Sequence, residues 1–144
     1  RGPGCTVADV LRATEFVMPS IEIIDSRFHG WNIGLCDTIA DNASSAALVL
    51  GGRKVSVERL DLRTLGVLVS RNGELIDTGA AGAVLGNPAV AVAWLANKLA
   101  TFGMDLPAGS VILPGSCTRA HDVVAGDVVL AEFAELGAVS VRFA

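Results

Sequence analysis

The spacing of apolar residues at the start of the chain changes from that of a helix to that of a strand. Thr6, followed three residues later by Asp9, is typical of a helix N-cap with an acidic first turn. Because proline cannot continue a helix, we expect this helix to end at Pro19. Its buried face would be formed by Val7, Val10, Leu11 and Phe16.

Residues 19–28 alternate in a way that predicts a strand, with Ile21 and Ile23 on one face and Ser20, Glu22 and Ile24 on the other. An ionised carboxylate buried without a partner is costly, so Glu22 in this apolar strand needs a cation. The alternative is a glutamate on an edge strand, in water or paired with Arg27. The sequence leaves both open.

The middle of the chain predicts an antiparallel sheet. Residues 46–50 and 62–70 are typical of buried strands, and the Asn-Gly pair within residues 71–74 is a hairpin signal that joins the second strand to residues 75–78. Residues 31–45 are irregular and polar, which predicts a loop. Such side chains hydrogen-bond to nearby backbone, and they can equally line a pocket.

A long helix follows the predicted hairpin. Asn87 and Pro88 are typical of a cap followed by proline at the first helical position, and Gly103 should terminate the helix after Thr101. Apolar residues surround most of this helix, so we expect it to be buried on several sides. Further strands are predicted at residues 111–113, 128–133 and 139–143, the last two joined by a turn at residues 135–137. The fold class is α+β, mostly β.

Composition narrows the function classes. A chain of 144 residues is the size of one domain, and 51% hydrophobic against 18% charged residues predicts an extensive interface, as in a homo-oligomer. The net charge of −4 has no basic run that could follow phosphates, and the chain has no tyrosine, so nucleic acid is excluded as a partner.

Membrane and secreted classes fit poorly. The uncharged residues 78–97 are interrupted by glycines and by Asn87-Pro88, which excludes a transmembrane helix. No leader-like segment opens the chain, and because Arg1 stands first we expect a cut start. The widely spaced cysteines, Cys5, Cys36 and Cys117, suggest reduced thiols in a cytoplasm rather than disulfides or a zinc site.

Several polar residues have simple structural explanations. Asp25 and Arg27 share a strand face and should form a local ion pair. The glycine-rich residues 79–86 lack a following Lys-Ser/Thr, which favours a tight turn over a nucleotide site. His29 and His121 are expected in exposed turns, and a triad of Ser116 with His121 would rest only on closeness in the sequence.

Five stretches in order resemble the 2-hydroxypenta-2,4-dienoate (2-keto-4-pentenoate) hydratases of the fumarylacetoacetate hydrolase superfamily. They are PSIEIIDSRFHGW, CDTIADNASSAALVLGG, AVLGNPAVAVAWLANKLATFG, LPGSCTRA and LGAVSVRF. The resemblance runs nearly from end to end. It implies the C-terminal mixed β-sandwich or roll of that superfamily, with one long buried helix.

The resemblance also implies a divalent ion, Mg²⁺ or Mn²⁺, held by a Glu-x-Glu pair and a third carboxylate. The third position corresponds to Glu22, but no Glu-x-Glu occurs in this chain. We expect that pair, and a lysine used in acid-base chemistry, in an N-terminal segment upstream of Arg1. Residues 1–144 would then be the C-terminal portion of the catalytic domain, unable to hold the ion well alone.

The same resemblance assigns roles to two polar turns. Asp41 and Ser44 are the predicted catalytic residues. The predicted substrate contacts are Asn42, Ser45, Ser116 and Thr118. Asn32 departs from the lysine that relatives often carry after the tryptophan, which removes any role of that charge here.

The implied reaction is hydration of a 2-hydroxy-dienoate, through its 2-oxo tautomer, to a 4-hydroxy-2-oxo acid in aromatic or steroid catabolism. The implied partners are this small substrate, further copies of the chain and a downstream aldolase. Two alternatives stay open: decarboxylation of 4-oxalocrotonate, and a non-catalytic subunit that docks on an active partner.

Overall fold

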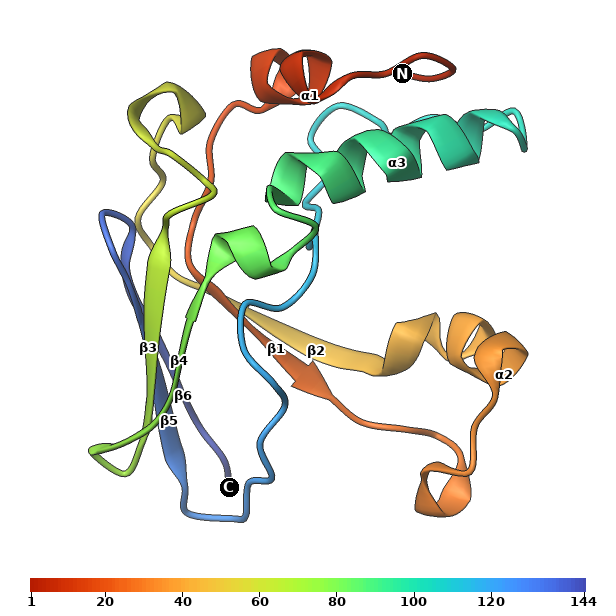
Figure 1. The fold of residues 1–144 in the computed structure, drawn as a ribbon. Helices are drawn as coiled ribbons and strands as arrows, with labels where there is room; N and C mark the ends of the chain where they lie inside the picture. Colours follow the sequence, from red (N-terminus) through yellow and green to blue (C-terminus); the bar gives the residue numbers. More distant parts are fainter.

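The computed structural model describes residues 1–144, which form two antiparallel sheets and three α-helices (Figure 1). The larger sheet has the strand order β4-β3-β5-β6 and the smaller one pairs β1 with β2. The strands are β1 (Ser20–Ile24), β2 (Ser45–Leu50), β3 (Gly66–Arg71), β4 (Glu74–Ala80), β5 (Val128–Phe133) and β6 (Gly137–Arg142). The α-helices are α1 (Val7–Ala13), α2 (Leu35–Ala40) and α3 (Pro88–Ala100). The predicted α+β class, mostly β, is confirmed.

Both predicted hairpins of the larger sheet are present. Asn72 and Gly73 adopt positive φ angles of 54° and 85° between β3 and β4, as the tight turn of a twisted hairpin requires. Glu135 and Gly137 do the same between β5 and β6, with φ angles of 63° and 91°. The residues of these two turns therefore made both hairpins of the larger sheet predictable from the local sequence.

Two of the helices, α1 and α3, begin where the sequence predicts. Thr6 and Asp9 form a capping box at the start of α1, and the Asn87 side chain accepts a hydrogen bond from the Ala89 amide at the start of α3. However, α1 ends at Ala13, not at Pro19, because Thr14 already has extended backbone angles. The residues from there to β1 form an extended connection, which includes a bridge between Val17 and Val55.

Helix α3 is buried along one side only, which corrects the expectation of a helix buried on several sides. Ala89 and Ala93 pack against Val10 of α1 in a small core cluster. On the opposite side Trp94 is 63% exposed. The apolar residues around this helix therefore serve both the core and the surface.

Two further sequence predictions are wrong. The polar residues 31–45 contain α2 rather than only a loop, because the Asp37 carboxylate accepts a hydrogen bond from the Gly34 amide and caps this helix. The turn Asn42–Ser44 follows as a short 3-10 helix. Residues 111–113 form no strand; they lie in a long irregular connection between α3 and β5.

The core consists of several small clusters rather than one large one. Val67, Ala131 and Val139 of the larger sheet pack with Ile21 and Val49, which come from the two-stranded sheet. Strands β1 and β2 then extend away from the larger sheet, carrying α2 at their far end (Figure 1). Much apolar surface stays exposed on this arm, including Trp31 at 51% exposure. No helix has the length and apolar character needed to cross a bilayer.

Candidate active site

A cavity of about 970 Å³ lies between β1, the larger sheet and the connection of residues 106–123. Its wall is mostly apolar, and α1 and α3 also contribute to it. Ligand sites in proteins are commonly concave and apolar with a few convergent polar groups. This cavity has that character, and the polar groups on its wall define the candidate site.

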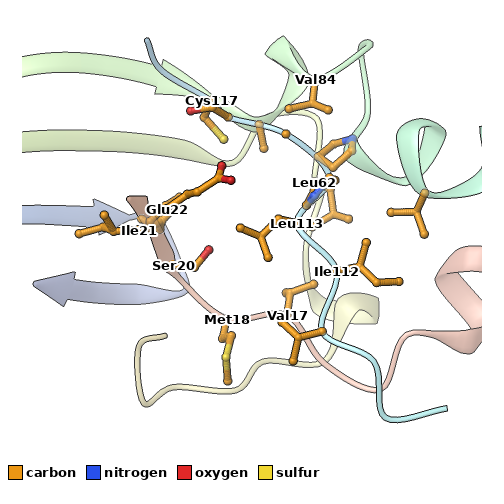
Figure 2. Close-up of a pocket in the computed structure, with 18 of the residues that line it drawn as sticks. Val17, Met18, Ser20, Ile21, Glu22, Leu62, Val84, Ile112, Leu113 and Cys117 are labelled. Carbon is orange, nitrogen blue, oxygen red and sulfur yellow. The ribbon is translucent and has the colours of Figure 1, made fainter. Parts of the chain in front are cut away.

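Glu22 lies on the cavity wall at the middle of β1. The alternation of the strand turns Ile21 into the core against Val49 and turns Glu22 to the opposite face. Figure 2 shows the Glu22 carboxylate pointing into the cavity toward Cys117. The alternative that Glu22 pairs with Arg27 is wrong, because Arg27 pairs with Asp41. Glu22 is instead an exposed carboxylate facing an apolar cavity.

The turn of residues 115–118 faces Glu22 across this part of the cavity. The Ser116 hydroxyl donates to the Thr118 carbonyl oxygen at 2.7 Å, which fixes the turn. Cys117, in the middle of this turn, is half-buried against the core clusters that contain Leu65 and Val67, and burial raises the pKa of its thiol. Ser116 and Thr118, two predicted substrate contacts, both line the cavity.

His121 is not in an exposed turn, which corrects the sequence prediction. Its side chain is 21% exposed, and Nε2 lies 2.8 Å from Oδ2 of Asp77 on β4. The hydrogen bond from His121 is the main cause that lowers the pKa of the Asp77 carboxyl. Because His121 binds Asp77 and Ser116 binds Thr118, the two do not form a Ser-His pair.

Asp41 binds Arg27 at the outer end of the two-stranded sheet. Arg27 Nη1 donates to Asp41 Oδ1 at 2.6 Å, and the Arg27 amide donates to Oδ2 at 3.0 Å. These bonds lower the pKa of the Asp41 carboxyl, whose side chain is 1% exposed. The predicted ion pair of Arg27 with Asp25 is therefore wrong. Arg27 pairs instead with Asp41, which directly follows α2.

Ser44 is also buried in this turn, and its hydroxyl has no hydrogen-bond partner. Asn42, Ala43 and Ser44 all have positive φ angles, between 53° and 60°. Left-handed backbone is unfavourable for such residues and persists only where the surroundings hold it in place. The Asp41–Arg27 bonds supply that support on one side of the turn.

The predicted site residues thus fall into two groups. Glu22, Ser116 and Thr118 line one cavity. The other four, Asp41, Asn42, Ser44 and Ser45, lie at the end of the β1–β2 pair and are not part of its wall. Their roles stay predictions. The Asp77–His121 pair could not be predicted from the sequence, because nothing local links residues so far apart in the chain.

The chain by itself does not offer a complete cation site. No group of three or more His, Cys, Asp or Glu side chains is positioned to hold a metal ion. Glu22 stands alone on its part of the wall, and one carboxylate leaves most coordination positions of Mg²⁺ to water. The residues present therefore do not fit a resident ion without ligands from outside the chain.

Comparison with known proteins gives several relatives, although no family model matches. The chain is 49% identical over 142 residues to 4-oxalocrotonate decarboxylase from Pseudomonas sp. strain CF600, covering 99% of the chain and 54% of the relative. It is 54% identical over 103 residues to 2-hydroxypent-2,4-dienoate hydratase from Pseudomonas putida, covering 72% of the chain and 46% of that relative.

A solved structure agrees with these relatives. The fold matches 4-oxalocrotonate decarboxylase from Pseudomonas putida G7, complexed with magnesium and adipate, with a TM-score of 0.96 and 46% identity. The match covers 100% of this chain and 55% of that chain. The chain thus spans about half the length of the curated relatives it matches. The order of the quoted motifs, the fold and these identities agree: the chain belongs to the family of the 2-keto-4-pentenoate hydratases and 4-oxalocrotonate decarboxylases in the fumarylacetoacetate hydrolase superfamily.

Proposed function

We propose that the protein carrying this chain is a lyase that hydrates 2-hydroxypenta-2,4-dienoate, or an alkyl homologue, to a 4-hydroxy-2-oxo acid. The observation that carries the proposal is the Glu22 carboxylate on the wall of a mostly apolar cavity, opposite the Ser116–Thr118 turn. An apolar cavity suits a small conjugated chain, and the few polar groups can orient its oxygen-bearing end.

The reaction needs proton transfers and a water molecule. The dienol gives up its hydroxyl proton and takes a proton at C5, which makes the conjugated 2-oxo tautomer; water then adds across the remaining C3=C4 bond, with the hydroxyl on C4 and a proton on C3. The apolar wall limits the entry of other water. The Thr118 hydroxyl can donate to the bound acid, whereas the Ser116 hydroxyl, which donates to the Thr118 carbonyl oxygen, would contact the substrate through its oxygen as an acceptor. Asp41 and Ser44 remain our candidates for proton transfer, with Asn42 and Ser45 as substrate contacts, if another segment or copy brings substrate to their turn.

The proposal includes a divalent ion, Mg²⁺ or Mn²⁺, in the complete protein. Glu22 would supply one of its ligands, and the others would come from a segment that is not part of this chain. A homo-oligomer would cover the exposed apolar arm, and a downstream aldolase would use the 4-hydroxy-2-oxo product. Three free cysteines are in keeping with a cytoplasmic protein.

Two alternatives have an observation in their favour. The 49% identity to a 4-oxalocrotonate decarboxylase and the TM-score of 0.96 favour decarboxylation of that substrate. The lack of a three-ligand metal cluster favours a non-catalytic subunit. Turnover of the complete protein with both substrates separates the three functions.

The variant Glu22→Gln tests the site. In the complete protein with Mg²⁺, we expect its turnover of 2-hydroxypenta-2,4-dienoate to fall at least about 100-fold, because losing a ligand to the ion removes several kcal/mol of charge stabilisation. Calorimetry should show weaker Mg²⁺ binding, and circular dichroism an unchanged fold. Glu74→Gln, at an exposed position outside the cavity, is the matched control. Full activity and Mg²⁺ binding in Glu22→Gln would remove Glu22 from the site.

A further inference from the structure

We propose that His121 is a catalytic residue that transfers the proton of the substrate's 2-hydroxyl group, that Asp77 positions it, and that Arg119 binds the substrate's carboxylate. The inference rests on the proposed function, since it assigns residues to the first step of that reaction. Asp41 and Ser44 lie outside the cavity wall, so the wall itself has no assigned group that can accept this proton. His121 and Arg119 both line the cavity, from the connection before β5.

The connection that carries both residues lies along one face of β4 (Figure 1). Asp77 and Gly79 are alternate residues of this strand and therefore share a face. Gly79 lies against the Cys117 carbonyl oxygen, and Asp77 holds His121. Since each residue advances a strand by about 3.4 Å, the two contacts are roughly 7 Å apart along β4. His121 therefore lies in the same part of the cavity as the turn that faces Glu22.

Asp77 decides which nitrogen of His121 can act as a base. The hydrogen bond from His121 is the main cause that lowers the pKa of the Asp77 carboxyl, so this group is an ionised carboxylate and only accepts hydrogen bonds. Nε2 of His121, at 2.8 Å from Oδ2, therefore carries the proton of the neutral ring and donates the bond. Nδ1 then holds the free lone pair. It has no hydrogen-bond partner within the chain and is not buried.

Arg119 is a cation that is free to bind a carboxylate. Its side chain is 80% exposed, and its Nε lies 3.8 Å from an Asp77 oxygen that is already bound by His121. A guanidinium group binds a carboxylate through two parallel hydrogen bonds. Arg119 Nε and His121 Nε2 both lie within 3.8 Å of the same oxygen, so the two side chains are close neighbours.

This closeness matches the substrate. In a 2-hydroxy acid the carboxylate and the 2-oxygen are on adjacent carbons. A carboxylate held by Arg119 therefore brings the 2-hydroxyl group beside the His121 ring. This placement uses only side chains of the chain itself.

The proton transfer is balanced within one substrate molecule. Nδ1 of His121 takes the proton of the 2-hydroxyl group, and the electron pair of that O–H bond forms the C2 carbonyl. The C2=C3 pair moves to C3=C4, and the C4=C5 pair takes a proton at C5. The imidazolium returns its proton there, so the histidine ends neutral and no co-reactant is needed. The product is the conjugated 2-oxo acid to which water then adds.

The variant His121→Gln tests the proton transfer. The glutamine amide can still donate to Asp77, but it has no nitrogen that accepts a proton. In the complete protein with Mg²⁺, we expect kcat for the loss of the dienol absorbance of 2-hydroxypenta-2,4-dienoate to fall at least about 100-fold, with KM little changed. His29→Gln, at an exposed histidine outside the cavity, is the matched control and should keep the full rate. A His121→Gln protein as fast as His29→Gln overturns the inference.

The variant Asp77→Asn separates positioning from packing. The Thr78 amide donates to Asp77 Oδ1 at 2.8 Å, so an asparagine would place its carbonyl oxygen there and turn its NH₂ group toward His121. Nε2 must then accept, the ring proton moves to Nδ1, and the base is lost. We expect kcat to fall at least about tenfold with KM little changed. A merely structural role would lower stability and leave kcat of the folded protein unchanged. If His121→Gln does not fold, an unchanged kcat in Asp77→Asn overturns the inference.

Arg119 is tested by binding rather than by turnover. The probe is 2-oxopentanoate, which has the 2-oxo acid end but no double bond, and its dissociation constant is measured by calorimetry on the complete protein with Mg²⁺. Arg119→Gln should weaken binding at least about tenfold, and Arg119→Lys, which keeps the charge, should weaken it less. Arg59→Gln, at an exposed arginine outside the cavity, should bind as the unaltered protein does. Equal binding by Arg119→Gln removes Arg119 from the site.

The outcomes separate this inference from the proposed function. Loss of dienol absorbance that yields no 4-hydroxy-2-oxo acid, but is slowed in His121→Gln, supports the inference and overturns the hydration. Hydration at the full rate in both His121→Gln and Asp77→Asn supports the proposed function and overturns the inference.

Discussion

At the scale of single residues, Gly79 allows β4 to run directly against the turn that faces Glu22. A Cβ atom at this position would lie 2.1 Å from the Cys117 carbonyl oxygen and 3.1 Å from Cγ2 of Thr118. Backbone oxygen cannot move away without moving the turn itself. The glycine therefore sets how closely Ser116, Cys117 and Thr118 approach the sheet.

Gly79→Ala should lower the free energy of unfolding by about 1–3 kcal/mol, the usual cost of inserting a methyl group into a packed site. Urea unfolding checks this value. Gly52→Ala is the control, because a Cβ at Gly52 has no atom within 4 Å and its φ angle is not positive. A Gly79→Ala protein as stable as Gly52→Ala would show that the turn gives way freely.

Residue-scale predictions from the sequence succeeded where the cause is local. The period of two in β1 was enough to separate Ile21 from Glu22. It could not identify the partner of Arg27, because Asp41 is brought there by the intervening turn and helix. The Asp77–His121 pair joins residues 44 positions apart, so no spacing in the sequence indicates it.

At the scale of elements, capping side chains decided which helices could be predicted. The helices α1 and α3 carry their signals in a few adjacent residues, and both begin as predicted. The short α2 was missed because its cap at Gly34 and Asp37 lies among polar residues that are equally typical of a loop. Residues 111–113 were wrongly predicted as a strand because apolar residues that line a cavity look like those of a buried strand.

The cap of α3 gives a prediction at this scale. Asn87→Ala should lower the free energy of unfolding by about 1 kcal/mol, since the Ala89 amide loses its side-chain acceptor. Asn87→Gly should cost only a few tenths of a kcal/mol, because glycine is itself a tolerated cap. Thermal unfolding of the two variants side by side provides the measurement. An Asn87→Ala protein as stable as the unaltered chain would mean that the hydrogen bond to Ala89 contributes nothing to the helix.

At the scale of the whole molecule, carboxylates hold distant segments together. Asp127 accepts hydrogen bonds from the Val124 amide and from Asn72, and so ties the start of β5 to the hairpin of β3 and β4. Asp41 ties the turn before β2, residues 41–44, to Arg27, and Asp77 ties β4 to His121. In each case these bonds lower the pKa of the carboxyl.

Acid should therefore destabilise the fold. The pKa of Asp9 and of Asp61 is lowered to about 2, whereas unfolded aspartates titrate near about 3.9. Below the unfolded pKa the unfolded chain binds more protons, so this stability is complete above about pH 5 and is lost as the pH falls toward about 2. Urea midpoints should be nearly constant between pH 6 and about pH 5 and should then fall steadily down to pH 3.

The variant Asp127→Asn tests the origin of this acid sensitivity. Its carboxamide cannot be protonated in this range, so the decrease between pH 6 and pH 3 should be smaller than in the unaltered chain, although the variant starts less stable. Asp25→Asn, which removes an exposed aspartate, is the control. An unaltered pH dependence in Asp127→Asn would mean that other carboxyls carry the effect.

The exposure of both tryptophans determines what the intrinsic fluorescence of the chain reports. The sequence has two tryptophans and no tyrosine, so Trp31 on the arm and Trp94 on α3 are its main ultraviolet chromophores. With 51% and 63% of their surface in water, both indoles should emit nearly as they do in an unfolded chain. A shift of that emission to shorter wavelength would therefore mark the covering of the arm or of α3 by another segment or copy, while core packing would leave it almost unchanged.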